Sequence, residues 1–232
     1  MQSPTRKRVS PMHLSCCIWA LRGPEEDNLK RMAELGFGWI DIQPQMLATA
    51  EVQAQAKALG LAVSCVGVSF GMPEGAALDS PSAEARAAAL AHMDRALAHA
   101  ASVGASAAYV IPGLDGRADA LRRYADSVAI AAERAQTHGL TLGIEHFPGR
   151  ALDTAAATLE FVRSVGHPNL YLLFDSGHIQ MRNEDPAEII RRAGVQLSYV
   201  HLDDNDSQGD LHWALLDGVM TEDSLRRIFA AL

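Results

Sequence analysis

The sequence has little of several features that mark whole classes of protein. Its 232 residues include three cysteines, Cys16, Cys17 and Cys65, too few for a disulfide framework and without Cys-x-x-Cys spacing. No apolar run approaches the roughly 18 residues of a membrane-spanning helix. Basic residues number 20 against 28 acidic ones, and the formal charge of −8 disfavours a nucleic-acid backbone as partner. We therefore expect a cytoplasmic protein that binds a small molecule, with neither membrane nor nucleic acid as partner.

The N-terminal segment also lacks the features of a targeting signal. Basic residues stand at positions 6 to 8, but Pro11 and His13 interrupt the segment after them, and the next apolar stretch is too short for a secretory signal. Residues 1–12 are therefore expected to form a flexible tail. With 48% hydrophobic residues, the remaining chain can build a sizeable core, so residues 13–232 are expected to form one α/β domain.

A regular alternation of helix, glycine and apolar run is the main pattern that is present. Helical segments end at Gly36, Gly60, Gly104, Gly139, Gly166 and Gly194, and an apolar run comes after each glycine. This repetition predicts βα units and a parallel sheet. Strands are expected at residues 13–18, 39–42, 62–68, 107–111, 140–145, 170–175 and 197–202.

Seven such units indicate a TIM (β/α)8-type barrel whose eighth strand is missing from the sequence. Because open sheet edges are avoided, three explanations remain: seven strands close the barrel, another segment or chain fills the gap, for instance in a homo-oligomer, or the sequence is truncated. A doubly wound open sheet is the alternative topology. It is disfavoured because no Gly-x-Gly-x-x-Gly or Walker loop comes after the first strand.

Three of the expected strands deliver a possible metal ligand at or near their ends. Glu145 ends TLGIE, Asp175 ends YLLFD and His201 ends LSYVH. Because side chains alternate between the two faces of a strand, all three can point to one interior while the opposite face meets helices. Each residue alone is more simply explained as a loop acid or a core histidine. Three in phase on successive strands favour a shared site.

The segments GFGWIDI, LGIEHFPG, LLFDSGH and YVHLDD, in this order, resemble the sugar phosphate isomerase/epimerase family of xylose isomerase-like TIM barrels over roughly residues 13–232. The resemblance implies a divalent ion (Mn, Mg, Co or Zn) held by Glu145, Asp175 and His201. It implies that Glu145 removes a proton next to a carbonyl, while the ion stabilises the enediolate. It also implies substrate contacts for His178 and Asp204.

The sequence departs from the family pattern at several points. It ends before the strand that would carry the second catalytic Glu of the epimerases, and His146-Phe147 stands where Asn-His is common. Asp217 replaces a Glu in the glycine-rich turn before the last helix, and Ser207 replaces an Arg of the ketose epimerases. These departures disfavour a two-base epimerisation by this chain alone, because that reaction needs a second carboxylate.

The expected activity is a metal-dependent isomerase or epimerase acting on a small sugar-like carbonyl compound. Two alternatives stay open: a dehydratase acting on a keto-polyol such as inosose, and a non-catalytic metal- or sugar-binding relative. A DNA-repair endonuclease on the same barrel is disfavoured by the acidic charge.

Several further residues are weaker candidates. His212, in a polar loop near the expected mouth of the barrel, could contact substrate, as could Asp41 at the end of the second strand. Trp19 and Phe70 could form an apolar wall. Cys65 is expected in the core, and His92 and His99 are expected to form a surface or interface stripe on one helix.

Overall fold

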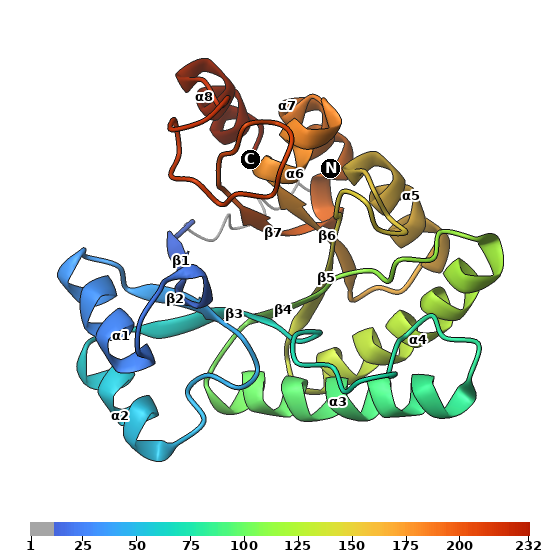
Figure 1. The fold of residues 1–232 in the computed structure, drawn as a ribbon, viewed down its shortest axis with the longest axis horizontal. Helices are drawn as coiled ribbons and strands as arrows, with labels where there is room; N and C mark the ends of the chain where they lie inside the picture. The colour runs from blue at the N-terminus through green and yellow to red at the C-terminus, as the bar shows by residue number, and fades with distance from the viewer. Residues whose placement is uncertain (1–11) are drawn as a thin grey trace, which may run out of the picture.

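The chain folds into a single parallel sheet with helices along one side (Figure 1). The computed structural model describes residues 12–232. Strand order is the order of the chain, and every neighbouring pair is parallel. The strands are β1 (Ser15–Cys17), β2 (Trp39–Ile42), β3 (Ala62–Gly67), β4 (Ala107–Val110), β5 (Thr141–Glu145), β6 (Leu170–Asp175) and β7 (Leu197–His201). The expected βα succession is confirmed, and the doubly wound alternative is wrong.

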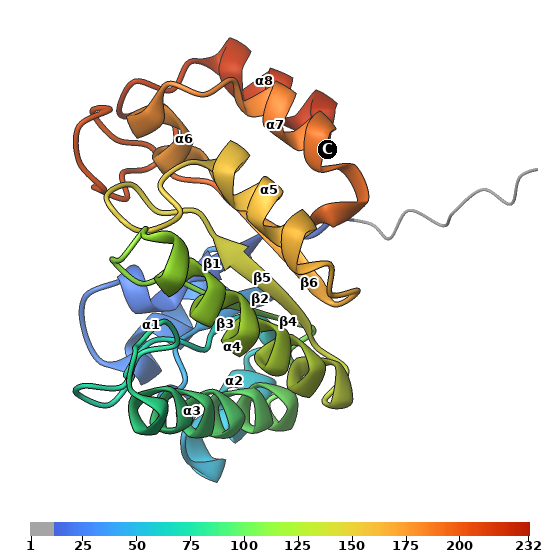
Figure 2. The ribbon, with the colours of Figure 1, turned by 90° about the vertical axis from the view of Figure 1, so that its right-hand side faces the viewer.

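Helices alternate with the strands and cover the outer side of the curved sheet. Figure 2 shows α3, α4, α5, α7 and α8 one beside the next, and their buried apolar side chains pack against the strands. The helical elements are η1 (Ile18–Ala20), α1 (Glu25–Glu34), α2 (Ala50–Ala58), α3 (Ala83–Ser102), α4 (Ala118–Thr137), α5 (Ala155–Val165), α6 (Ser176–Arg182), α7 (Pro186–Ala193), η2 (Gly194–Gln196) and α8 (Glu222–Ala231).

Local sequence signals set the ends of these helices. The six glycines expected just past helix ends all have positive φ; Gly166, for example, ends α5 with φ 67°. At the other end, Thr154 caps α5, accepting from the backbone N–H of Ala157, and Thr221 caps α8 in the same way. The helices therefore begin and end where short polar residues and glycine favour it.

The sheet is open, because β1 and β7 are not paired with each other anywhere in residues 12–232. The fold is thus a TIM-barrel-like half-barrel of seven strands, and the possibility that seven strands close the barrel is wrong. A side chain connects the two ends instead: the Tyr199 hydroxyl on β7 lies 2.8 Å from Asp41 Oδ1 on β2 and 2.7 Å from Ser64 Oγ on β3. Since a carboxylate only accepts, Tyr199 donates to Asp41.

Two expectations concern parts of the chain outside the sheet. The tail expected at residues 1–12 lies outside the described residues, except for Met12, which is exposed. Among the helices that the structure describes, none combines the length and the hydropathy that a membrane crossing requires.

Candidate active site

An irregularity in β7 positions the candidate site. In the pairing of β6 with β7, Leu172 lies opposite Leu197, but Leu173 lies opposite Tyr199, so Ser198 is an extra residue. This bulge brings His201 directly opposite Asp175. Without it, Val200 would occupy that place and His201 would be displaced along the strand.

The three predicted metal ligands meet at the carboxyl ends of β5, β6 and β7. His201 Nδ1 lies 2.9 Å from Glu145 Oε1 and 3.7 Å from Asp175 Oδ2. All three side chains are at least nine-tenths buried. The strand phase that the sequence predicted is therefore the phase that the structure has, while the role of these residues as metal ligands stays a prediction.

The charges in this cluster influence one another strongly. Burial alone would lower the pKa of His201, but hydrogen bonds and the negative charges of Asp175 and Glu145 outweigh burial and raise it well above its usual value. Burial alone would raise the pKa of Asp175, but the two histidines His178 and His201 outweigh burial and lower it. The site therefore stabilises the ionised carboxylate of Asp175 next to positive charge.

His178 lies beside this cluster because of α6, a helix that the sequence patterns did not predict. Asp175 is its N-cap, and Oδ1 of Asp175 accepts from the backbone N–H of His178 at 2.9 Å. His178 Nδ1 lies 2.8 Å from the His146 carbonyl oxygen, and since a carbonyl only accepts, Nδ1 carries a proton. The second nitrogen, Nε2, lies 3.5 Å from Asp210 Oδ1.

The pKa of His178 is a result of these neighbours. Burial alone would lower it, but the carboxylates of Asp175, Asp210 and Glu145 raise it to about 9. When no cation is bound at Nε2, both ring nitrogens are therefore expected to carry protons near neutral pH, and Nε2 can donate to an oxygen atom. Asp210 also lies 3.5 Å from Nε2 of His212, whose side chain is 40% exposed. The predicted substrate contacts His178 and His212 thus both lie near one carboxylate oxygen, which makes no hydrogen bond within the described residues.

Asp204, an expected substrate contact, makes its hydrogen bonds to the backbone of a neighbouring segment. Its carboxylate is fully buried and accepts from the backbone N–H groups of Asn205, Gly218 and Met220 at 2.8, 2.8 and 3.0 Å. These bonds hold the segment before α8 against the end of β7. These contacts favour a structural role for Asp204, and its contact with substrate stays a prediction.

Its neighbour Asp203 takes the place closer to the cluster, which strand alternation could have indicated. Asp203 Oδ1 accepts from the Gly177 backbone N–H at 2.9 Å, while Oδ2 is buried without a partner in the described residues. Burial and the negative charge of Asp175 raise the pKa of Asp203 to about 7. No sequence signal pointed to Asp210, which lies in the polar loop, or to His146, whose Nε2 accepts from the Asp175 backbone N–H at 3.1 Å.

The weaker candidates have mixed outcomes. The Asp41 carboxylate points into the interior of the half-barrel, 3.9 Å from His201 Nε2. Trp19 and Phe70 lie 5.6 Å apart between ring centroids, and Cys65 is fully buried, as expected.

His92 and His99, expected as a surface or interface stripe, are half-buried on one helix and contact neighbouring loops. His92 Nε2 lies 2.9 Å from the carbonyl oxygen of Phe70, and His99 Nε2 lies 2.8 Å from that of Met46. These contacts let α3 hold the loops that come after β3 and β2.

The residues present suit a divalent cation. Glu145, Asp175 and His178 offer ligand atoms that all lie within 4.8 Å of one another, with His201 alongside. Nε2 of His178 and Nε2 of His201 are buried without hydrogen-bond partners in the part of the chain that the structure describes. Carboxylate and imidazole donors of this kind suit Mn²⁺, Mg²⁺, Co²⁺ or Zn²⁺.

The chain is similar to several known proteins in sequence and in fold. Over 198 residues the chain is 25% identical to the L-ribulose 3-epimerase of Mesorhizobium japonicum, covering 80% of this chain and 67% of the relative. It is 30% identical over 106 residues to the inosose dehydratase of Geobacillus kaustophilus, covering 41% and 34%. A crystal structure of D-psicose 3-epimerase in the presence of D-fructose superposes with a TM-score of 0.77 at 21% identity, covering 95% and 80%.

The sequence model of one family spans most of the chain. It matches residues 29–232, a range that contains strands β2 to β7. The same range contains Glu145, Asp175, His178 and His201. The chain therefore belongs to the xylose isomerase-like TIM barrel family.

Proposed function

We propose that this protein is a metal-dependent isomerase or epimerase that acts on a small polyhydroxy carbonyl compound. The observation that carries the proposal is the buried Glu145 carboxylate, fixed by His201 and set beside Asp175 and His178. The likeness to sugar 3-epimerases supports the same reaction class.

Glu145 is the proposed base. His201 donates to its Oε1 at 2.9 Å, which fixes the carboxylate and leaves the other oxygen for a substrate proton. His178, protonated on Nε2, would donate to a substrate oxygen and stabilise negative charge that develops on it. A divalent ion held by Glu145 and Asp175, with His201 Nδ1 as a further ligand once that nitrogen has released its proton, would supply additional stabilisation of that charge.

Proton abstraction can be tested separately from complete epimerisation. The purified chain would be incubated in D₂O with Mn²⁺ and a panel of ketoses that includes L-ribulose, D-psicose and D-fructose, and NMR would measure deuterium incorporation next to the carbonyl. A base that removes the proton exchanges it with solvent, so incorporation is expected even where no epimer forms. This measurement does not require a second carboxylate.

Glu145→Gln should abolish the incorporation, because the amide cannot accept the proton. Glu160→Gln is the matched control, since Glu160 lies on the exposed side of α5 and contacts Arg163. Incorporation that persists in Glu145→Gln would reject Glu145 as the base. No incorporation with any metal and ketose, despite binding of Mn²⁺, would instead favour a non-catalytic metal-binding protein.

A dehydratase is the second candidate, supported by the likeness to inosose dehydratases. It would use the same base and then expel a hydroxyl group from the neighbouring carbon. The same NMR experiment with an inosose distinguishes the two reactions, because dehydration gives a new enone or enol product whereas exchange leaves the carbon skeleton and its hydroxyl groups in place.

A further inference from the structure

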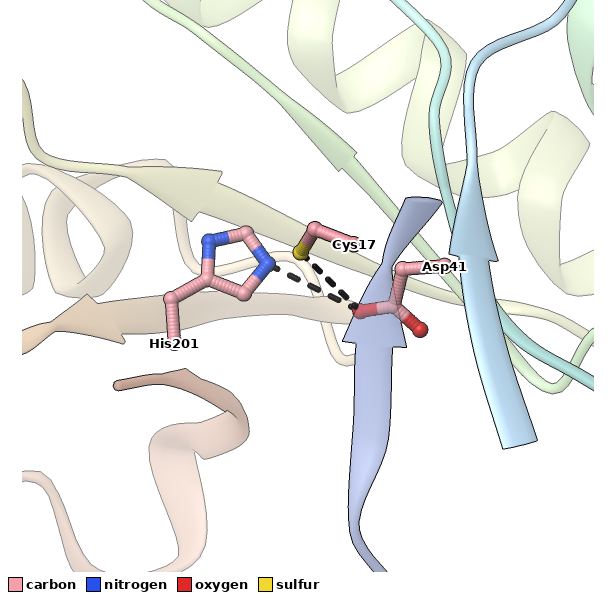
Figure 3. A group of neighbouring side chains, drawn as sticks. All are labelled: Cys17, Asp41 and His201. Atoms are coloured by element: carbon pink, nitrogen blue, oxygen red, sulfur yellow. Dashed lines mark hydrogen bonds and ion pairs between the residues drawn. The ribbon is translucent and has the colours of Figure 1, made fainter. Parts of the chain in front are cut away.

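A second group of metal-binding side chains lies on the other side of the His201 ring. Figure 3 shows Cys17, Asp41 and His201 converging from β1, β2 and β7. Cys17 Sγ and His201 Nε2 each lie 3.9 Å from Asp41 Oδ2. One ligand atom from each of the three residues lies within 4.8 Å of the others. Cys17 and Asp41 are direct partners in the pairing of β1 with β2, so the sheet itself holds them together.

The Asp41 carboxylate is oriented so that one oxygen is left for a ligand. Its Oδ1 accepts from Ser15 Oγ at 2.7 Å, from the Tyr199 hydroxyl at 2.8 Å and from the Cys65 backbone N–H at 3.2 Å. Three donors fill the lone pairs of Oδ1 and fix the rotation of the side chain. Oδ2 faces the Cys17 thiol and the His201 ring. Such orientation by outer hydrogen bonds is typical of carboxylates that bind metals.

His201 supplies an independent observation that points to a ligand. Its side chain is nine-tenths buried, and Nε2 has no hydrogen-bond partner within residues 12–232. At 3.9 Å, Asp41 Oδ2 is too far to accept a hydrogen bond from it. The nitrogen therefore points at Asp41 and Cys17 without being satisfied by either, an arrangement that a bound cation would complete.

We propose that Cys17, Asp41 and His201 Nε2 form a second cation site, selective for a borderline-soft divalent metal such as Zn²⁺ or Co²⁺. The donor set of one sulfur, one oxygen and one nitrogen suits such an ion, whereas Mg²⁺ and Mn²⁺ prefer oxygen ligands. Around tetrahedral Zn²⁺, with bonds of about 2.0–2.3 Å, neighbouring ligand atoms lie roughly 3.3–3.6 Å apart. Closing the two 3.9 Å separations therefore requires movements of only about 0.3–0.6 Å.

This site is distinct from the one proposed for catalysis, although both use the same imidazole. His201 Nδ1 faces Glu145 and Asp175, and Nε2 faces Cys17 and Asp41. When the second ion binds, Cys17 loses its thiol proton and His201 loses the proton on Nε2, both to solvent. The thiolate and Nε2 then form bonds to the metal, so no redox partner is needed. The inference goes beyond the proposed function, because a thiolate takes no part in proton transfer next to a carbonyl.

Cobalt spectroscopy tests the proposal directly. The metal-free chain would be titrated with Co²⁺, and absorption would be recorded in the near-ultraviolet, where a cobalt–thiolate bond gives an intense charge-transfer band. The band is expected in the native sequence and is expected to disappear in Cys17→Ser. Cys16→Ser is the matched control: it neighbours Cys17 on β1, but alternation turns it to the other face, where it packs against the core, so the band should persist.

Two further variants separate this site from the catalytic one. Ser15→Ala removes a donor to Asp41 Oδ1 and should weaken Co²⁺ binding roughly 10- to 100-fold while the band remains at saturation. Glu145→Gln should keep the band even if Mn²⁺ binding and deuterium exchange are lost. No band in the native chain at saturating Co²⁺, survival of the band in Cys17→Ser, or equal loss in Cys16→Ser would each overturn the second site, whatever the result for the proposed reaction.

Discussion

Replacement of Asp204 by asparagine tests whether this residue supports the fold or binds substrate. The Asp204 carboxylate is fully buried and accepts three backbone hydrogen bonds, two at Oδ1 and one from Gly218 N at Oδ2. An asparagine can keep both bonds at Oδ1, but it places an NH₂ group against the Gly218 N–H. One hydrogen bond to a charged group is lost, which corresponds to about 2 kcal/mol of unfolding free energy.

For a chain of this length, that loss lowers Tm by about 4–8 °C, measurable by differential scanning calorimetry or by urea denaturation. Asp217→Asn is the control, because Asp217 lies in the same segment with an exposed side chain. Asp204→Asn should leave the substrate dependence of deuterium exchange unchanged once the variant is folded. A native Tm together with an increased KM would refute the structural role and restore Asp204 as a substrate contact.

The stability difference between the native protein and Asp204→Asn is also expected to depend on pH. Burial alone would raise the pKa of Asp204, but hydrogen bonds from Met220, Gly218 and Asn205 outweigh burial and lower the pKa below its usual value. A carboxyl group whose folded pKa is lowered stabilises the fold above its unfolded pKa of about 3.9, and this contribution disappears as pH falls through the folded value. The difference in stability between native and Asp204→Asn should therefore be constant near neutrality and shrink below about pH 4.

Two further substitutions test how the site is built. In Gly177→Ala, the new Cβ would lie 2.5 Å from Asp203 Oδ1. We therefore expect the free energy of unfolding, measured by urea denaturation, to fall by about 1–3 kcal/mol and deuterium exchange to weaken. Native stability would show that the contact is not tight. Thr154→Ala removes the acceptor for Ala157 N–H at the start of α5 and should cost about 1 kcal/mol without affecting exchange at saturating substrate. An effect on exchange would contradict a purely local capping role.

Much of the fold could be predicted because each signal is local. Glycine at helix ends, apolar runs and capping residues act over a few residues, so the strands at 39–42, 141–145 and 170–175 were placed to within one residue. Strand alternation likewise predicted that Glu145, Asp175 and His201 point to one interior. Period-two geometry is sufficient for that conclusion and needs no knowledge of distant contacts.

The remaining features depend on interactions that sequence patterns do not contain. The Ser198 bulge, which aligns His201 with Asp175, arises from the pairing of β6 with β7. Helix α6 is only seven residues long and begins at a metal-binding candidate, so it carries no amphipathic repeat. Asp204 was assigned by its likeness to a family position, although alternation favours Asp203. The detailed arrangement of side chains at the site can therefore be derived only from the three-dimensional contacts.

The hydrogen bonds of Tyr199 have a consequence for how such an interior can change. In a closed barrel the width of the lumen is set by the number and stagger of strands, which point mutations do not alter. Here a phenol of fixed length spans the lumen from the last strand to the second and third strands. The separation of Asp41 from His201, and with it the radius of an ion in the proposed second site, therefore depends on the length of the Tyr199 side chain, which a single substitution can change.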